Sequence, residues 1–238
     1  MTDPSPNSAR RDELAVRLAA VRQRISAACE AAGRDVGDIT LIAVTKTHPA
    51  SDVRLLAALG VRDLGENRDA EAAPKAAQCA DLSLTWHFIG QLQTNKCASV
   101  VRYATVVHSV DRTRLIRALG MAARRAGRVI DCLVEVSLDG DPARGGAPEA
   151  EVLALAEALA AEGGLVLRGV MAIAPLGTAA DRAFAKLRES AELVRAVSPA
   201  ATVISAGMSA DLEAAVTAGA THLRIGTALL GDRGPRVR

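Results

Sequence analysis

The stretch Leu41-Ile42-Ala43-Val44-Thr45-Lys46-Thr47-His48-Pro49 contains the pattern that decides the fold. An aliphatic and β-branched run is followed by a polar corner, and an Ala- and Leu-rich segment of helical period comes next. Continuous apolar runs are typical of strands that are buried on both faces, whereas a strand with one solvated face alternates. The same unit of strand, corner and helix recurs about eight times along the chain, as the apolar periodicity indicates.

We place the strands at 40–45, 61–64, 85–89, 105–108, 129–136, 166–171, 202–204 and 222–225. Strands that alternate with helices predict a parallel sheet that is covered on both faces. Eight such units in about 200 residues favour the α/β class and a closed (β/α)8 TIM-type barrel. The alternative is an open doubly wound sheet, because a strand count from sequence can differ by one.

An extra N-terminal helix precedes the first strand. Its apolar residues recur at spacings of three and four, namely Leu14, Leu18, Val21, Ile25 and Cys29. Gly33 follows them as a helix stop. We expect a flexible N-terminal tail at 1–10 and a single barrel domain at 11–238, because no Pro- or Ser-rich linker divides the chain.

The composition excludes several classes of protein. With 238 residues and 50% hydrophobic content, the chain can bury a core without disulfides or metals. Aromatic residues make up 2% and the net charge is +2, so neither base stacking nor a strong positive field predicts nucleic-acid binding. No apolar run of about 18 residues occurs and the N-terminus is polar, so we expect neither membrane insertion nor secretion.

The cysteines do not have the short spacing of a metal site. They are Cys29, Cys79, Cys97 and Cys132. Metal ligands of this type usually occur in pairs a few residues apart. We interpret the four side chains as reduced, buried thiols of a cytoplasmic protein, and we expect no metal.

Lys46 directly follows the first predicted strand. Because the carboxyl ends of barrel strands carry the active-site loops, we expect its side chain at the barrel mouth. Partial desolvation there lowers the pKa of a lysine, and its amine can then form an imine with a carbonyl compound. The alternative is a strand-end lysine whose ammonium group reaches the solvent.

Small and hydroxyl residues follow the last two predicted strands. Ser205-Ala206-Gly207-Met208-Ser209 precedes a helical segment, and Gly226-Thr227 follows the eighth strand. Barrels frequently bind phosphate at this place through backbone N–H groups, although ordinary turns and helix caps use the same residue types. An amine and a phosphate site together indicate a ligand with a carbonyl group and a phosphate. Pyridoxal phosphate fits, and so does a sugar phosphate in an imine-forming aldolase.

Seven blocks of sequence resemble those of one family. They are Ala43-Val44-Thr45-Lys46-Thr47, Gly65-Glu66-Asn67, Trp86-His87-Phe88-Ile89-Gly90, Leu92-Gln93-Thr94-Asn95-Lys96, Arg168-Gly169-Val170-Met171-Ala172-Ile173, Gly207-Met208-Ser209-Ala210-Asp211 and Arg224-Ile225-Gly226-Thr227-Ala228. In this order, and over nearly the whole chain, they resemble the pyridoxal phosphate homeostasis protein family.

The resemblance implies a single-domain barrel similar to the N-terminal domain of alanine racemase. It also implies pyridoxal 5'-phosphate as cofactor, held as an internal aldimine on Lys46, which stands where the family's lysine ends the first strand. Asn67 matches an asparagine near the cofactor ring, and Arg224 matches the arginine that faces the pyridine nitrogen. The positions that match the family's phosphate ligands are Ser205, Met208, Ser209, Gly226 and Thr227.

The match at Arg224 has a mechanistic consequence. A guanidinium stays protonated, so its donation to the ring nitrogen disfavours a pyridinium and weakens the cofactor as an electron sink. A racemase also needs a second acid or base, and Tyr103, the only tyrosine, precedes the fourth strand, away from the motif loops. We therefore expect a cytoplasmic monomer that supplies or buffers pyridoxal phosphate, with dependent apoenzymes as partners. A weakly active pyridoxal-phosphate-dependent amino-acid racemase or lyase is the alternative.

Several residues have open roles. Glu135 stands where the family usually has a glutamine. His87 is either a barrel-wall histidine or a group near the cofactor, and Lys96 is either a solvated helix-start residue or a second amine for the cofactor's aldehyde. We expect structural roles for the remaining histidines, which are too far apart for a local metal motif: His48, His108 and His222.

Overall fold

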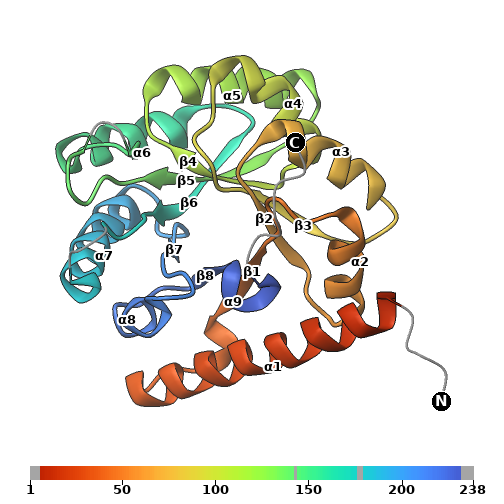
Figure 1. The fold of residues 1–238 in the computed structure, drawn as a ribbon. Coiled ribbons are helices and arrows are strands. Elements are labelled where there is room, and N and C mark those ends of the chain that lie inside the picture. The colour runs from red at the N-terminus through yellow and green to blue at the C-terminus, as the bar shows by residue number, and fades with distance from the viewer. Residues whose placement is uncertain (1–5, 142–143, 176–178, 232–238) are drawn as a thin grey trace, which may run out of the picture.

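The computed structural model describes residues 6–141, 144–175 and 179–231. In these ranges eight parallel strands close into a barrel in chain order, and the last strand pairs with the first (Figure 1). The predicted TIM-type barrel is therefore confirmed, and the open sheet is excluded. The strands are β1 (Thr40–Val44), β2 (Asp63–Glu66), β3 (Thr85–Phe88), β4 (Val106–Val110), β5 (Ile130–Glu135), β6 (Leu165–Met171), β7 (Val203–Ser205) and β8 (His222–Ile225).

Strand β2 departs most from its predicted position at 61–64. Its first residue, Asp63, pairs with β1, and its last, Glu66, pairs with β3. Val61 instead closes the end of the preceding helix, where its N–H donates to the carbonyl of Leu56 at 3.0 Å. The register therefore places a glutamate inside the strand, at a position that we expected in a loop.

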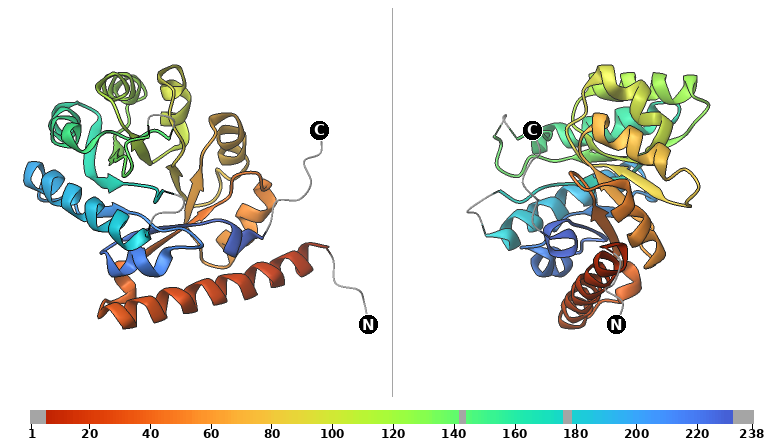
Figure 2. Two further views of the ribbon diagram at one scale, coloured as in Figure 1. Left: turned by 60° about the vertical axis from the view of Figure 1, so that its left-hand side comes forward. Right: turned by 45° about the vertical axis from the view of Figure 1, so that its right-hand side comes forward.

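The helices form a layer around the barrel (Figures 1 and 2). They are α1 (Pro6–Ala32), α2 (Ala50–Ala58), α3 (Asp69–Gln78), α4 (Cys97–Tyr103), α5 (Thr113–Arg125), α6 (Val152–Ala161), α7 (Ala180–Val197), α8 (Leu212–Thr217) and α9 (Thr227–Leu230). The short 3-10 helices are η1 (Val36–Asp38), η2 (Thr94–Lys96) and η3 (Glu149–Glu151). Within the described ranges, no helix has the length and apolar character that a membrane crossing requires.

Helix α1 runs along one edge of the barrel and packs against α2, α8 and α9 (Figure 1). Its predicted apolar face is confirmed, because the five residues are at most 3% exposed: Leu14, Leu18, Val21, Ile25 and Cys29. The helix ends before Gly33, whose φ of 64° suits a residue without a side chain. It begins at Pro6, inside the predicted tail 1–10, where Arg10 donates to Asp52 at 2.7 Å. Residues 1–5 of that tail lie outside the described ranges.

The core is aliphatic, as the composition predicts, and includes the buried aromatic residues Trp86, Phe88 and Phe184. All four cysteines are buried and free of disulfide bonds. The strands also carry buried polar side chains. Those that bear on the site are Glu66, His87, His108, Glu135, Ser205 and Arg224, on β2, β3, β4, β5, β7 and β8.

Candidate cofactor site

Lys46 lies in the turn after β1, at the carboxyl end of the barrel, and is half-buried. The next residue, Thr47, has a φ of 68°, a left-handed conformation that β-branched residues rarely adopt. The Thr47 N–H donates to Glu71 at 3.0 Å, and this contact holds the turn. Backbone strain of this kind is typical of functional sites.

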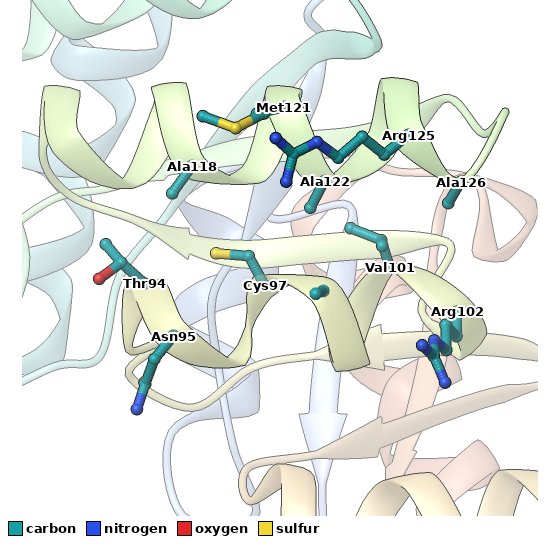
Figure 3. A pocket seen from close by; sticks show the side chains of 11 residues that line it. Thr94, Asn95, Cys97, Val101, Arg102, Ala118, Met121, Ala122, Arg125 and Ala126 are labelled. Carbon is teal, nitrogen blue, oxygen red and sulfur yellow. The ribbon is translucent and has the colours of Figure 1, made fainter.

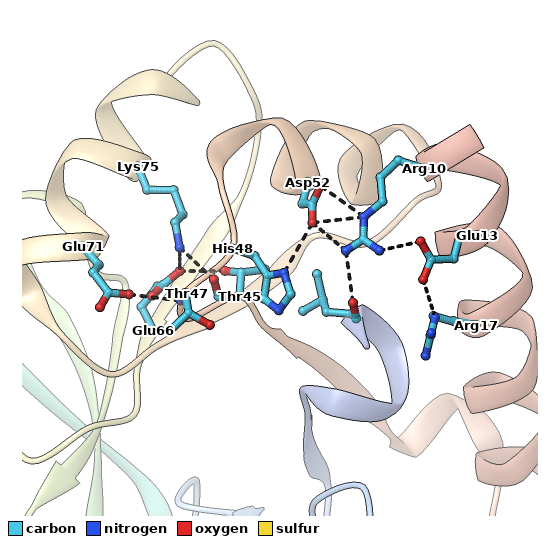
Figure 4. A network of polar contacts seen from close by, with 11 residues as sticks. Arg10, Glu13, Arg17, Thr45, Thr47, His48, Asp52, Glu66, Glu71 and Lys75 are labelled. Atoms are coloured by element: carbon cyan, nitrogen blue, oxygen red, sulfur yellow. Dashed lines mark hydrogen bonds and ion pairs between the residues drawn. The ribbon is translucent and has the colours of Figure 1, made fainter. Parts of the chain in front are cut away.

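A buried ion pair supports the same turn (Figure 4). Lys75 of α3 donates to Glu66 at 2.5 Å and to the carbonyl of Thr45 at 2.8 Å. The Thr45 hydroxyl donates to the same Glu66 oxygen, Oε1, at 2.7 Å. Burial raises the pKa of Glu66, and the hydrogen bond from Lys75 opposes that rise. Sequence reasoning missed this cluster, because Glu66 was expected in a loop and its partner lies on the following helix.

A second polar cluster joins the turn to the N-terminal helix (Figure 4). His48 Nδ1 lies 3.5 Å from Oδ2 of Asp52, which is buried. Arg10 donates to that carboxylate at 2.7 Å and to the carbonyl of Leu230 at 3.0 Å. Burial lowers the pKa of His48, and the charge of Asp52 opposes that effect. These contacts agree with the structural role that we expected for His48.

Two glycines allow site loops to approach other parts of the chain. Asn67 is half-buried directly after β2, and a Cβ on Gly90 would lie 2.2 Å from its carbonyl oxygen. Gly207, in the loop after β7, has a φ of 88°, and a Cβ there would lie 2.6 Å from the Cβ of Ala215. Larger residues at either position would displace the loops that carry Asn67 and Met208.

The loops after β7 and β8 meet, as the phosphate-site prediction requires. The backbone N–H of Ala228 donates to the hydroxyl of Ser209 at 3.2 Å. The N–H of Met208 donates to Asp211 at 2.5 Å, and the Met208 side chain is exposed. Gly226 and Thr227 stand at the start of α9, beside this contact. The structure therefore brings four of the five predicted phosphate ligands together at the ends of neighbouring strands.

Arg224 is buried on β8, next to β1, where it pairs with Ile42. Its guanidinium donates to Ser205 Oγ at 2.6 Å and to the carbonyl of Ala172 at 2.7 Å. Burial lowers the pKa of Arg224 to about 10, so the group remains charged at pH 7. Ser205 is fully buried, and its hydroxyl also lies 3.0 Å from His108 Nδ1. The fifth predicted phosphate ligand thus contacts Arg224 and a histidine inside the barrel.

Glu135 ends β5 and is 7% exposed. Its Oε2 atom has no hydrogen-bond partner among the described residues. Burial and the charge of Asp111 raise the pKa of Glu135 to about 7, against the opposing charge of Arg224. The sequence marks this residue only as a departure from the family, and we did not predict it as a site residue.

The residues with open roles lie in different surroundings. His87 is buried on β3, 2.8 Å from His108 and 3.0 Å from Asp63. Lys96 is exposed at the end of η2, as a solvated helix-start residue would be. Tyr103 lies closer to the second loop than its chain position predicted, since its hydroxyl is 3.4 Å from an oxygen of Asp69 at the start of α3.

A groove between α4 and α5 lies in the outer helical layer (Figure 3). Its volume is about 380 Å³, and Met121, Arg102 and Arg125 are among its lining residues. None of the predicted cofactor-binding residues lines it. It is therefore separate from the candidate cofactor site at the barrel mouth.

The side chains at the mouth suit an aldehyde that carries an anionic group and an aromatic ring nitrogen. Lys46 offers an amine, Arg224 a buried cationic donor, and the joined loops at Ser209 and Gly226 small residues at an anion site. Glu135 leaves a buried carboxylate oxygen without a partner among the described residues. The same ranges contain no cluster of three or more His, Cys, Asp or Glu side chains suited to a metal ion.

Fold and site together define a barrel of the alanine racemase type. The family described as "Alanine racemase, N-terminal domain" matches residues 16–234. The alanine racemase of Corynebacterium glutamicum shares this fold, with a TM-score of 0.69 at 18% identity over 92% of this chain and 60% of that one.

Closer relatives narrow the assignment. The chain is 45% identical to the "Pyridoxal phosphate homeostasis protein" of Mycobacterium tuberculosis, over 94% of each chain. It is 36% identical to the Escherichia coli protein of the same name, over 93% of this chain and 97% of that one. The chain belongs to the pyridoxal phosphate homeostasis protein family. A solved relative, PipY of Synechococcus elongatus with PLP bound, superposes with a TM-score of 0.81 at 37% identity, over 92% of this chain and all of PipY.

Proposed function

We propose that this protein binds pyridoxal 5'-phosphate covalently through Lys46 and takes part in the intracellular homeostasis of that cofactor, supplying or buffering it. The observation that carries the proposal is that Lys46 follows β1 directly, and the buried cation Arg224 lies on β8, the strand that pairs with β1. Both residues are therefore near the carboxyl ends of neighbouring strands, in the same sector of the barrel. The names of the relatives and the PLP bound to PipY support this function.

Each side chain has a role in this proposal. The Lys46 amine would hold the aldehyde carbon of the cofactor, and Asn67 would contact its ring. We assign the phosphate to the Ser209 hydroxyl and to the backbone at Gly226 and Thr227. The Met208 N–H donates to Asp211, so Met208 would hold the phosphate only by exchanging that partner for it. Ser205 receives a different role from the one that the resemblance implies, because its buried hydroxyl already contacts Arg224 and His108.

Arg224 determines how reactive the bound group is. Pyridoxal phosphate, when bound, supplies an electron sink for chemistry at an amino-acid carbon. Arg224 stays protonated at pH 7, so with the cofactor bound its guanidinium would donate to the ring nitrogen and disfavour a full proton there. The sink is weakened, and a carrier is favoured over an efficient catalyst.

Tyr103, the only tyrosine of the sequence, is poorly suited to act as a second acid or base. Burial and the charge of Asp69 raise the pKa of Tyr103 far above its ordinary value, so the phenol keeps its proton. A phenol that stays protonated at pH 7 has no base available to remove a proton from a substrate carbon. We therefore propose a cytoplasmic monomer that exchanges the cofactor with dependent apoenzymes. Slow racemase or lyase turnover is the alternative, and it would be seen as Lys46-dependent exchange of an amino-acid α-proton for deuterium.

The test is the intact mass after mixing with pyridoxal phosphate and reducing with borohydride. We expect the wild type to gain one reduced cofactor and Lys46→Ala to gain none. Lys96→Ala is the matched control, because it removes an exposed lysine elsewhere, and it should gain one cofactor like the wild type. Equal labelling of the wild type and Lys46→Ala would reject Lys46 as the attachment site. No labelling of the wild type would reject covalent binding and reopen the sugar-phosphate aldolase.

A further inference from the structure

A chain of buried hydrogen bonds runs through the barrel and ends at Arg224. Asp63 Oδ1 lies 3.0 Å from His87 Nε2, and His87 Nδ1 lies 2.8 Å from His108 Nε2. His108 Nδ1 lies 3.0 Å from Ser205 Oγ, which accepts from Arg224 at 2.6 Å. These contacts connect β2, β3, β4, β7 and β8, so they link opposite parts of the barrel wall.

Only the Asp63 end of this chain is open to solvent. The Asp63 side chain is 28% exposed, whereas the other four members are at most 4% exposed. Asp63 begins its strand and so lies toward the amino end of the barrel, away from Lys46. A fourth histidine, His222, has its ring 6.3 Å from that of His87, but its Nδ1 contacts Thr221 at 2.9 Å. His222 is therefore a neighbour of the chain and not a member.

The chemistry of the groups fixes the direction of every hydrogen bond. The Asp63 carboxylate only accepts, so His87 donates from Nε2. A neutral His87 then accepts at Nδ1, which makes His108 the donor from its own Nε2. A neutral His108 accepts at Nδ1, and the donor there is the Ser205 hydroxyl. Arg224 only donates, so its partner is the oxygen of Ser205. With neutral histidines, one arrangement satisfies all four contacts.

The neutral state of His108 follows from its surroundings. It is fully buried, and burial lowers its pKa well below the ordinary value, with the charge of Arg224 acting in the same direction. A proton on Nδ1 of His108 would place a second donor on Ser205 Oγ, next to a cation. It would also deprive the Ser205 hydroxyl of its acceptor, and such a loss is costly in a buried site.

We propose that Asp63, His87, His108 and Ser205 are positioning residues that hold the Arg224 guanidinium in one orientation at the barrel mouth. The inference rests on the proposed function, in which Arg224 donates to the ring nitrogen of the bound cofactor. Because the Ser205 hydrogen is directed at His108, its oxygen lone pairs face Arg224. The carbonyl of Ala172 fixes the second Nη atom at 2.7 Å. Replacing Asp63, which does not contact Arg224, should therefore make the orientation of the Arg224 guanidinium less fixed.

The first test uses the cofactor-free protein and ¹⁵N-histidine NMR near neutral pH. From the hydrogen-bond directions we expect a hydrogen on Nε2 and none on Nδ1 of both His87 and His108. Asp63→Ala should shift the signals of both rings, and Asp63→Asn, which keeps an acceptor oxygen, should restore most of the shift. The matched control is Asp131→Ala, because Asp131 is also 28% exposed but pairs with Arg168 at 3.0 Å, outside the chain.

The second test measures the affinity for pyridoxal phosphate and the visible absorption spectrum of the loaded protein. Asp63→Ala removes the hydrogen bond that orients His87. We therefore expect its Kd for pyridoxal phosphate to rise about two- to tenfold and the ratio of the bound cofactor's absorption bands to change. Asp131→Ala should match the wild type in both. Asp63 has no assigned contact with the cofactor, so a purely local structural role would leave the spectrum unchanged.

The outcomes separate this inference from the proposed function. A hydrogen on His108 Nδ1, or equal effects of Asp63→Ala and Asp131→Ala, would overturn the inference while leaving cofactor binding intact. A wild type that takes up no pyridoxal phosphate would reject the proposed function, and with it the role of Arg224, whatever the NMR spectra show. The inference would be supported if the His87 and His108 signals shift only in the Asp63 variants and the Kd for pyridoxal phosphate rises in the same variants.

Discussion

Two glutamates are buried at the carboxyl end of this barrel, and their surroundings differ. Glu66 on β2 receives hydrogen bonds from Lys75 and Thr45 on one carboxylate oxygen. Among the described residues, no cationic side chain donates to Glu135 on β5, and its pKa is raised to about 7. Each also has one oxygen without a partner among the described residues. The difference teaches that a buried carboxylate with a partner supports the structure, whereas one without a partner becomes a titratable group at the site.

The largest effect is expected when the paired glutamate loses its lysine. Lys75→Met leaves the Glu66 charge buried without compensation and also removes a donor to the carbonyl of Thr45. Breaking a buried pair in this way typically costs about 3–5 kcal/mol of unfolding free energy. Urea unfolding at pH 7 measures the cost, and borohydride labelling of Lys46 reports whether the turn is disturbed as well.

The double variant Glu66→Gln/Lys75→Met is the control for this prediction. It removes both charges and should recover part of the loss, because no uncompensated charge remains buried. A loss below about 1 kcal/mol for Lys75→Met alone would show that the pair is solvated like a surface ion pair. The contrast with Glu135 would then disappear.

The unpaired glutamate should make stability depend on pH. The folded pKa of about 7 lies above the ordinary value of 4.5, so the folded state binds the proton more tightly than the unfolded chain. Stability from this group is present at low pH and is lost as the pH rises from about 4.5 through about 7. Between pH 5.5 and 8 the wild type should lose about 2 kcal/mol more than Glu135→Gln.

Urea unfolding at the two pH values measures this difference. Glu149→Gln, at an exposed position in η3, is the matched control and should keep the wild-type dependence. Parallel pH curves for the wild type and Glu135→Gln would mean that water or a neighbouring donor already stabilises the Glu135 carboxylate. That result would remove the distinction between the two glutamates.

The barrel was predictable from sequence because its signals are local. Each strand is a short apolar run and each helix has its own period, so β8 falls at the predicted 222–225. Strand β2 was misplaced because two of its four residues are charged, Asp63 and Glu66. Glu66 is buried beside Lys75, and Asp63 is half-buried beside His87. These partners lie on other elements, and a local pattern does not contain that information.

The site residues also fall into two groups, those marked by local sequence motifs and those that only the fold brings together. Lys46, Asn67 and Arg224 could be proposed from the sequence because they stand in motifs at strand ends. The chain from Asp63 to Ser205 was not, since its members are brought together only by closure of the barrel. The available signal was a set of polar residues inside otherwise apolar strands, such as His87 and His108. A closed barrel turns such positions toward a common interior, and this geometry could have directed attention to them.

The smallest effect is expected at an exposed ion pair, the solvent-facing counterpart of Lys75 and Glu66. Arg24 of α1 contacts Glu213 of α8 at 2.8 Å, and their side chains are 39% and 53% exposed. Glu213→Gln should cost less than about 1 kcal/mol, and less still at high salt, because water and ions screen both charges. Arg24 also donates to the carbonyl of Ser209 at 3.0 Å, a contact that the variant retains, so the Kd for pyridoxal phosphate should not change.

Urea unfolding of the wild type and Glu213→Gln at low and high salt measures the loss of unfolding free energy. A salt-independent loss as large as that of Lys75→Met would mean that burial is not what separates the two pairs, and that α1 is held to the phosphate loops mainly by this contact.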